Sequence, residues 1–195
     1  MRDELISLVA GPTDKTKLFR FGNISSDKYL SFIEGRARVL ARYISQINII
    51  PDNGVPLDIA RAYKNLGGEN VVGYIPKGGI KELEKYFSYC DRIEEFDLGW
   101  SGLNTCLSLK GNVVTVFGLS PGTLVEVAYT KYHKKYLNRV VPVIIDRTTI
   151  DGNIPPELTD EIDMKYFSTN DELVNILEEY KKWKAYTLED LTHFI

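Results

Sequence analysis

Short apolar segments recur along the chain, and most are followed by a stretch whose hydrophobic residues have helical spacing. Residues 5–10, 71–75, 112–117 and 140–145 lack the polar alternation of a half-exposed strand. The segment 112–117, NVVTVF, is rich in β-branched residues and predicts a central strand. Strands buried on both faces and joined by helices predict a doubly wound, mostly parallel α/β sheet with helices on both faces, which is a Rossmann-like fold.

The remaining elements follow from weaker signals of the same kind. Further strands are expected at 48–51, 92–96 and 164–167. Ser25, Ser26 or Asp27 is expected to cap a helix over 30–44, with Arg36, Arg38 and Arg42 on its surface. Other helices are expected at 56–66, 80–87, 101–109, 122–137 and 171–183.

Length and charge indicate one domain with an acidic end. The chain has 195 residues, of which 26% are charged, with net charge −3 at pH 7. Residues 1–150 carry net +4 and residues 151–195 carry net −7. We therefore predict a single domain over residues 1–183 and a C-terminal tail over 184–195.

Several classes of function fit the composition poorly. Net charge −3 argues against a general nucleic-acid binder, because such proteins present a basic footprint. No apolar run approaches the ~20 residues of a membrane span. Cys90 and Cys106 lack metal-ligand spacing and fit reduced thiols, which predicts a cytoplasmic protein. With only two histidines, His133 and His193, no metal site is expected, and His133 is expected on a solvated helix face.

Three loops that follow predicted strands combine glycine or proline with small polar residues. They are Gly11–Thr13, Pro51–Pro56 and Gly118–Glu126. Glycine lets a backbone approach an anion, and the free amides of a helix N-terminus bind phosphate. In the last loop, Ser120 as N-cap before Pro121, or Thr123 with Glu126 as a capping box, explains the sequence equally well. Helix capping and anion binding therefore both stay open.

The segment GTLVEVAYT, residues 122–130, follows an apolar strand and resembles the GGxGTxxE motif of the lonely-guy family in the SLOG superfamily of Rossmann-like nucleotide-binding proteins. The order of other segments is similar to that family: Ala10-Gly11, then Asp52-Asn53-Gly54 through Gly67-Gly68, then VVGYIP at 71–76. The resemblance covers roughly residues 5–183.

The resemblance implies a function and a set of site residues. Lonely-guy enzymes hydrolyse the N-glycosidic bond of nucleoside 5′-monophosphates, and Glu126 matches the catalytic glutamate of their motif. It implies no cofactor, a nucleotide or other phosphorylated small molecule as the ligand, and a homodimer. The expected ligand-binding residues are Gly11, Asn53, Gly54, Asn104, Gly118, Ser120, Gly122 and Thr123.

The sequence departs from the family pattern at two places. Leu119 and Ser120 replace the leading motif glycines, and Leu103 stands where the family has arginine. The first hypothesis is therefore a nucleotide-binding protein of this type, and the second is an active 5′-monophosphate phosphoribohydrolase. A relative of molybdenum-cofactor carriers or of DNA-processing proteins is the third.

Some further residues have two interpretations. Trp100 and Tyr74 are candidates to stack on a base, although an aromatic residue beside a strand end more often belongs to the core. Asp52 and Asn53 are candidates to bind ribose or a metal-water cluster, and as turn residues they also need no ligand. Tyr129, Tyr132 and Tyr136 are expected either to pack in a dimer or to cover the sheet edge.

Overall fold

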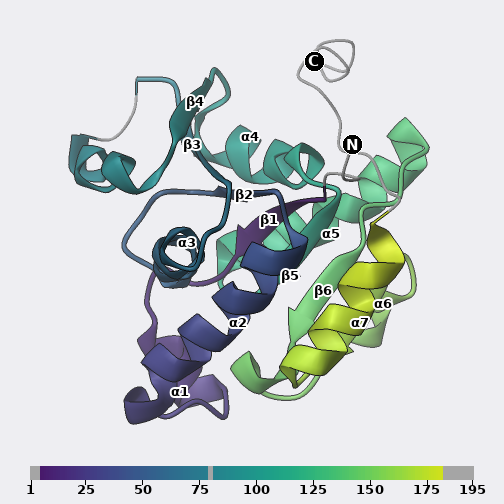
Figure 1. The fold of residues 1–195 in the computed structure, drawn as a ribbon. Helices are drawn as coiled ribbons and strands as arrows, with labels where there is room; N and C mark the ends of the chain where they lie inside the picture. The colour runs from purple at the N-terminus through teal and green to yellow at the C-terminus, as the bar shows by residue number, and fades with distance from the viewer. Residues whose placement is uncertain (1–4, 79–80, 182–195) are drawn as a thin grey trace.

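A computed structural model of the chain describes residues 5–78 and 81–181. Its strands form one parallel sheet in the order β4-β3-β2-β1-β5-β6-β7 (Figure 1). The strands are β1 (Ile6–Ala10), β2 (Gln46–Ile49), β3 (Asn70–Pro76), β4 (Arg92–Phe96), β5 (Val113–Val116), β6 (Val143–Asp146) and β7 (Met164–Phe167). The doubly wound α/β fold predicted from the apolar runs is confirmed.

Helices cover both faces of this sheet (Figure 1). The α-helices are α1 (Thr16–Phe21), α2 (Tyr29–Tyr43), α3 (Val55–Asn65), α4 (Gly99–Cys106), α5 (Pro121–Leu137), α6 (Pro156–Thr159) and α7 (Asn170–Tyr180). Short 3-10 helices are η1 (Ser26–Lys28), η2 (Lys81–Tyr89), η3 (Leu107–Lys110) and η4 (Arg147–Thr149). No helix in these described ranges is long and apolar enough to cross a lipid bilayer.

The two-sided burial of the strands divides the core into two layers. Val9, Val113 and Phe117 pack with α1, α2, α3 and α7 on one face. Leu8 and Val116 pack with α4, η3 and α5 on the other face. Because successive side chains of a strand point to opposite faces, continuous apolar runs are what this arrangement requires.

The observed elements differ from the expected ones mainly at their ends. The second strand begins two residues earlier, at Gln46, and the helix expected over 80–87 is the 3-10 helix η2. None of Ser25, Ser26 and Asp27 caps α2, because Ser26 and Asp27 belong to the 3-10 turn η1, which separates Ser25 from the helix. The short helices α1 and α6 were not expected, since six and four residues are too few to show a hydrophobic period. The predicted tail over 184–195 lies outside the described residues.

Two surface assignments from the sequence are wrong. Arg36 is only 7% exposed, because its guanidinium donates to the carboxylate of Asp146 at the end of β6. His133 is only 4% exposed, while the neighbouring Lys134 and Lys135 are exposed. A single polar residue on the buried side of an amphipathic helix hardly changes the hydrophobic pattern of the sequence. The charged residues around Arg36 and His133 therefore led to the wrong prediction that both side chains are exposed.

Candidate functional site

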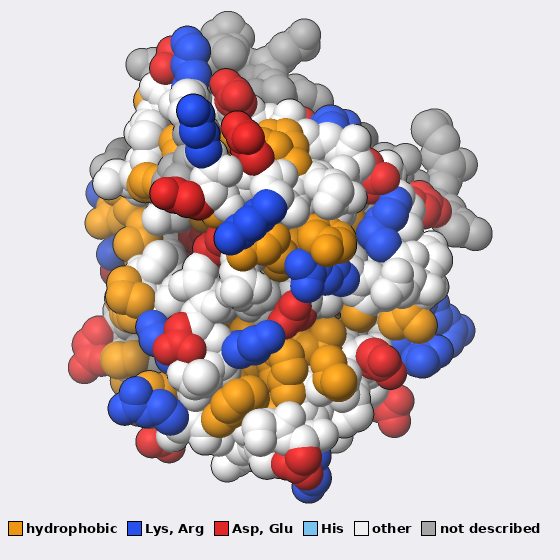
Figure 2. All heavy atoms as spheres, turned by 90° about the vertical axis from the view of Figure 1, so that its left-hand side faces the viewer, with side chains coloured by type: hydrophobic (Ala, Val, Ile, Leu, Met, Phe, Trp, Pro, Cys, Tyr) orange, Lys and Arg blue, Asp and Glu red, His pale blue; other side chains and the backbone are white. Residues whose placement is uncertain are grey.

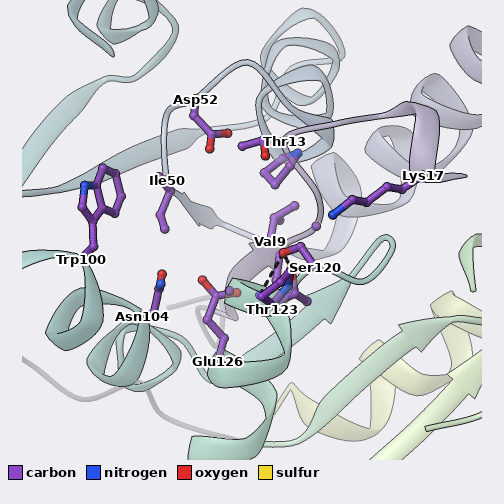
Figure 3. Close-up of a pocket in the computed structure, with 15 residues that line it drawn as sticks. Val9, Thr13, Lys17, Ile50, Asp52, Trp100, Asn104, Ser120, Thr123 and Glu126 are labelled. Carbon is purple, nitrogen blue, oxygen red and sulfur yellow. Dashed lines mark hydrogen bonds between the residues drawn. The ribbon is translucent and has the colours of Figure 1, made fainter. Parts of the chain in front are cut away.

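The order of the strands reverses between β1 and β5, because the first half of the chain extends the sheet on one side of β1 and the second half on the other. Ligands of open α/β sheets bind at such a switch point, beyond the carboxyl ends of the strands. A cavity of about 260 Å³ lies there (Figure 3). It is lined by Val9, Ala10, Gly11, Thr13, Lys17, Ile50, Asp52, Pro56, Trp100, Asn104, Ser120, Pro121, Gly122, Thr123 and Glu126.

The N-terminus of α5 forms one wall of the cavity. Ser120 is the N-cap, and its Oγ accepts a hydrogen bond from the Thr123 amide at 3.1 Å. The two hydroxyl groups, Ser120 Oγ and Thr123 Oγ1, are 2.9 Å apart. Pro121 occupies the first helical position, where its missing N–H costs nothing. The capping role expected for Ser120 is therefore present, and the same turn also faces the cavity.

Glu126 does not take part in this cap. It lies six positions after Ser120, whereas the glutamate of a capping box lies three positions after the N-cap. Its carboxyl group is turned into the cavity, and the whole residue is only 5% exposed (Figure 3). Burial, followed by the nearby charge of Asp52, raises the pKa of Glu126 to about 8. At neutral pH its carboxyl group is therefore mostly protonated.

Asp52 reaches the cavity from the loop after β2 and faces Glu126 across it (Figure 3). Burial raises the pKa of Asp52 to about 6, which the hydrogen bond from its own amide opposes in part. Two groups whose titrations interact share their protons, so both values describe the carboxyl pair formed by Asp52 and Glu126. Around pH 7 this pair carries close to one negative charge.

Residues from α1 and α4 complete the cavity. Lys17, on α1, points its ammonium group toward the cavity (Figure 3). Asn104, on α4, lies beside Gly122, because a Cβ built on that glycine would be 3.7 Å from Asn104 Nδ2. Trp100 is 37% exposed at the rim. Tyr74, the other aromatic candidate, is instead a core residue that packs edge-on against Phe96.

The glycines of the three loops have different roles. A Cβ on Gly122 would meet nothing closer than 3.7 Å, so the backbone there is open to the cavity. A Cβ on Gly54 would lie 2.6 Å from Pro12 O and Thr13 Cα, so this glycine lets two loops pack together. Gly118 has φ +106°, a conformation that favours glycine, and lies against Pro12 and Leu18.

The structure thus brings six of the nine expected site residues to one cavity: Gly11, Asn104, Ser120, Gly122, Thr123 and Glu126. Asn53 is exposed, and Asn53, Gly54 and Gly118 do not line the cavity. Lys17 was missed because no helix was expected after Gly11. The sequence did contain a signal for Lys17: it is a cation a few residues after the glycine turn that follows the first strand.

No protein-family profile and no curated protein matches this sequence. Solved structures do match. The structural-genomics target TM1055 is 19% identical, with TM-score 0.67, over 90% of this chain and 99% of its own. The molybdenum cofactor carrier protein MCP from Chlamydomonas reinhardtii is 17% identical, with TM-score 0.64, over 91% of this chain and 98% of its own. DNA processing protein A from Streptococcus pneumoniae is 12% identical, with TM-score 0.55, over 94% of this chain and 63% of its own.

These likenesses, together with the seven-stranded parallel sheet, define the fold class. The chain has the Rossmann-like α/β fold that these solved structures share, which confirms the fold class predicted from the sequence. At this level of identity the neighbours establish the fold, and a function has to be argued from the site.

Proposed function

We propose that this protein binds a phosphorylated small molecule of the nucleotide type in the cavity at the switch point, with the phosphate at the N-terminus of α5. The observation that carries the proposal is the convergence of an open backbone at Gly122, two hydroxyl groups and the Lys17 ammonium on one cavity. The partial positive charge of a 17-residue helix adds to this attraction. We call Lys17, Ser120, Gly122 and Thr123 the phosphate end of the cavity.

The size and rim of the cavity favour a particular placement of such a ligand. A volume of about 260 Å³ suits a sugar phosphate and is small for a whole dinucleotide. Trp100, partly exposed at the rim, offers a flat face on which a base can stack. The proposed pose therefore places phosphate and sugar inside the cavity and the base against Trp100.

Thermal unfolding tests this proposal directly. A ligand at about 100 times its Kd adds about 2.7 kcal/mol to the free energy of unfolding, which raises the Tm of a domain this size by roughly 5–10 °C. Phosphate and the four ribonucleoside 5′-monophosphates are the probes, at millimolar concentration. If none of these five compounds raises the Tm, the proposal is refuted.

A second candidate is hydrolysis of the N-glycosidic bond of a bound nucleoside 5′-monophosphate. The specific observation in its favour is the Glu126 carboxyl group, which is buried, turned into the cavity and without a hydrogen-bond donor among the described residues. A carboxylate there can stabilise positive charge that develops on the ribose while the bond from C1′ to the base breaks. Water then supplies a hydroxyl group to C1′ and a proton to the base. Leu103 is buried in the core, so Lys17 is the cation that this cavity offers in place of the family arginine.

Release of free base, followed by chromatography, tests the second candidate. Because the reaction needs the ionised carboxylate, its rate should rise with pH toward about 8, where Glu126 titrates. The Glu126→Gln variant should lose the activity by orders of magnitude. If none of the four nucleotides releases its base, the second candidate is refuted and the proposed binding function remains.

Two of the similar solved structures, the molybdenum cofactor carrier protein and DNA processing protein A, suggest other ligands. A role like that of the molybdenum cofactor carrier would use the same cavity, and a binding assay with that cofactor tests it. A DNA-processing role is less favoured, because Figure 2 shows basic and acidic side chains interspersed on the face it presents, with no continuous basic stripe. Net charge −3 agrees with this preference.

A cytoplasmic homodimer is also part of the proposal. Leu124, Val125, Tyr129 and Tyr132 of α5 are each between 37% and 41% exposed, and a group of exposed apolar residues is typical of an interaction surface. The side chain of Tyr136 lies outside the described set. Light scattering at micromolar concentration tests the dimer, and a monomer mass would refute it.

A further inference from the structure

A second cavity, of about 300 Å³, lies between the first half of α2 and the start of α7. These two helices lie side by side on one face of the sheet (Figure 1). Thr148 reaches the cavity from the end of β6, and Asn170 reaches it from the end of β7. The second cavity shares no lining residue with the cavity at the switch point, so it is a separate place for a ligand.

Arg36 lines the second cavity and keeps hydrogen-bond donors for a ligand. Its Nε donates to Asp146, its Nη1 to Asn170 Oδ1 and its Nη2 to the carbonyl of Ser168. A guanidinium has five N–H groups, so these three bonds leave two. Because Arg36 is only 7% exposed, little water is available to the two remaining groups, and an acceptor on a ligand in the cavity would satisfy them.

The side-chain amide of Asn170 is oriented by the same arginine. Because Arg36 Nη1 donates to Asn170 Oδ1 at 2.7 Å, the Nδ2 group of Asn170 is left to donate. A Cβ on Gly35 would lie 3.3 Å from this Nδ2, which is closer than an ordinary contact. Glycine destabilises the interior of a helix relative to alanine, and in α2 it leaves the Asn170 amide uncovered beside the cavity.

The charges around the second cavity favour a monovalent anion. Of the described residues, no acidic side chain lines it, whereas Lys28 and Arg36 do. The charge of Arg36 is balanced by the buried carboxylate of Asp146 at 2.7 Å. Asp27 and Glu172 act on these two cations from outside the cavity, and both carboxylates are exposed and therefore screened by water. One positive charge, on Lys28, is thus left to face a ligand, and a carboxylate matches it better than a doubly charged phosphate does.

Part of the lining is apolar. Ile24 and Phe32 lie in the same cavity as the polar groups, and Ile24 is only 6% exposed. The ring centre of Phe32 is 5.4 Å from Arg36 Cζ, so the apolar surface adjoins the guanidinium. A ligand with a carbon skeleton next to its charged group would cover this surface, which an inorganic anion cannot do.

We propose that the second cavity binds the carboxylate group of a small organic acid. Arg36, Lys28 and the Nδ2 group of Asn170 hold the carboxylate. The carbon skeleton of the acid lies against Ile24 and Phe32. This site adds a second class of ligand to the protein and does not depend on the nucleotide proposed for the switch point.

Benzoate is the probe, because it carries one carboxylate on an apolar ring, and benzamide has the same shape without the charge. The chemical shifts of the Gly35 backbone amide and the Asn170 side-chain amide report binding in ¹⁵N-labelled protein at pH 7. Benzoate should cause saturable shifts with a Kd of about 1–10 mM, as expected for so small a ligand. Benzamide and inorganic phosphate should bind there at least about 10-fold more weakly.

The main variant is Asn170→Asp, read out at Gly35. One aspartate oxygen still accepts from Arg36, and the other places a negative charge where Nδ2 was, so the Kd for benzoate should rise at least about 10-fold. An aspartate in the first turn of α7 is compatible with the helix dipole, so the fold should be retained. Asn153→Asp, an exposed change outside the cavity, is the matched control and should leave the Kd unchanged.

A second pair of variants tests the cation. Lys28→Gln should raise the Kd for benzoate about 3- to 10-fold, whereas Lys134→Gln, on the exposed side of α5, should not change it. Arg36 is kept in every variant, because its removal would leave Asp146 buried without its cation.

Four results would overturn the inference. They are the absence of saturable shifts at Gly35 up to about 50 mM benzoate, binding of benzamide or phosphate there as tightly as benzoate, an unchanged Kd in Asn170→Asp, and loss of benzoate binding in Gly122→Asp. The last variant puts a negative charge into the cavity at the switch point, so such a loss would place the anion there. Failure of nucleotides to bind would refute the proposed function alone, because the two cavities share no lining residue.

Discussion

Arg36 Nε donates to Asp146 Oδ2 at 2.7 Å, and the side chains of the two residues are 9% and 0% exposed. The remaining guanidinium nitrogens donate to Asn170 Oδ1 and to the carbonyl of Ser168, so α2 is tied to the ends of β6 and β7. Arg36 is therefore a structural residue that holds one side of the carboxyl edge of the sheet in place.

Removal of this arginine should destabilise the fold strongly. Arg36→Ala leaves the Asp146 carboxylate buried without its cation, and breaking one side of a buried ion pair costs about 3–5 kcal/mol. Urea denaturation measures the loss. Arg38→Ala, an exposed change on the same helix, is the control and should stay within about 0.5 kcal/mol. A loss below about 1 kcal/mol for Arg36→Ala would contradict the structural role.

Gly122→Asp should abolish ligand binding without unfolding the protein. A Cβ fits there, and an aspartate in the first turn of a helix is compatible with the helix dipole, but its charge would repel phosphate. The stabilisation by phosphate or nucleotide in thermal unfolding should disappear. Gly122→Ala is the matched control, which adds the Cβ without the charge and should keep most of the stabilisation. Equal stabilisation of wild type and Gly122→Asp would place the anion elsewhere.

Glu126→Gln should change how stability depends on pH. The pKa of Glu126 is raised from 4.5 to about 8, so the folded state binds more protons than the unfolded state between these values. Stability from this group is therefore complete below about pH 4.5 and is lost as the pH rises toward 8. The glutamine variant should gain stability relative to wild type between pH 5 and 8. If the stability of the two proteins changes with pH in parallel, the pKa of Glu126 is not raised in the folded state and its carboxyl group is charged there at neutral pH.

Asp52→Asn tests whether the charge of Asp52 affects the titration of Glu126. The charge of Asp52 contributes to the raised pKa of Glu126, so its removal should lower that pKa. Titration of the Glu126 carboxyl carbon by NMR would measure the shift. An unchanged titration would mean that the two groups do not interact and would weaken the view of them as a pair.

His133 should have the opposite pH dependence. Burial lowers the pKa of His133 from 6.5 to about 4, so the unfolded state binds more protons in this interval. Stability from this group is complete above about pH 6.5 and is lost as the pH falls to 4. His133→Leu should remove that loss, and it also removes a buried Nδ1 that has no hydrogen-bond partner within residues 5–78 and 81–181. A larger acid sensitivity in the leucine variant would refute this prediction.

The fold was largely predictable from the sequence because its signals are local. The run NVVTVF and its apolar counterparts specify buried strands whatever surrounds them, and Ser120-Pro121 marks the start of α5 within one residue of the expected position. The burial of Arg36 was not predictable, since it depends on Asp146, which is 110 residues away in the chain.

The candidate site was predictable only in part, for the same reason. Motif spacing identified Gly122, Thr123 and Glu126, which lie on one helix. Asp52 and Lys17 come from other loops and helices, and their approach to Glu126 depends on how β1, β2 and β5 are ordered in the sheet. No periodicity in the chain encodes that order.

The pairing of β1 with β5, from Ser7 with Val113 to Ala10 with Val116, joins the early and late parts of the chain at the sheet centre. Lys17 and Asp52 come from one side of this seam, and Gly122 and Glu126 come from the other. A molecule held in the cavity therefore contacts both parts of the chain across the β1–β5 pairing, and neither part alone forms its binding site. Hydrogen exchange of the β1 and β5 amides should accordingly slow when the ligand binds, because opening the seam then requires the ligand to leave first.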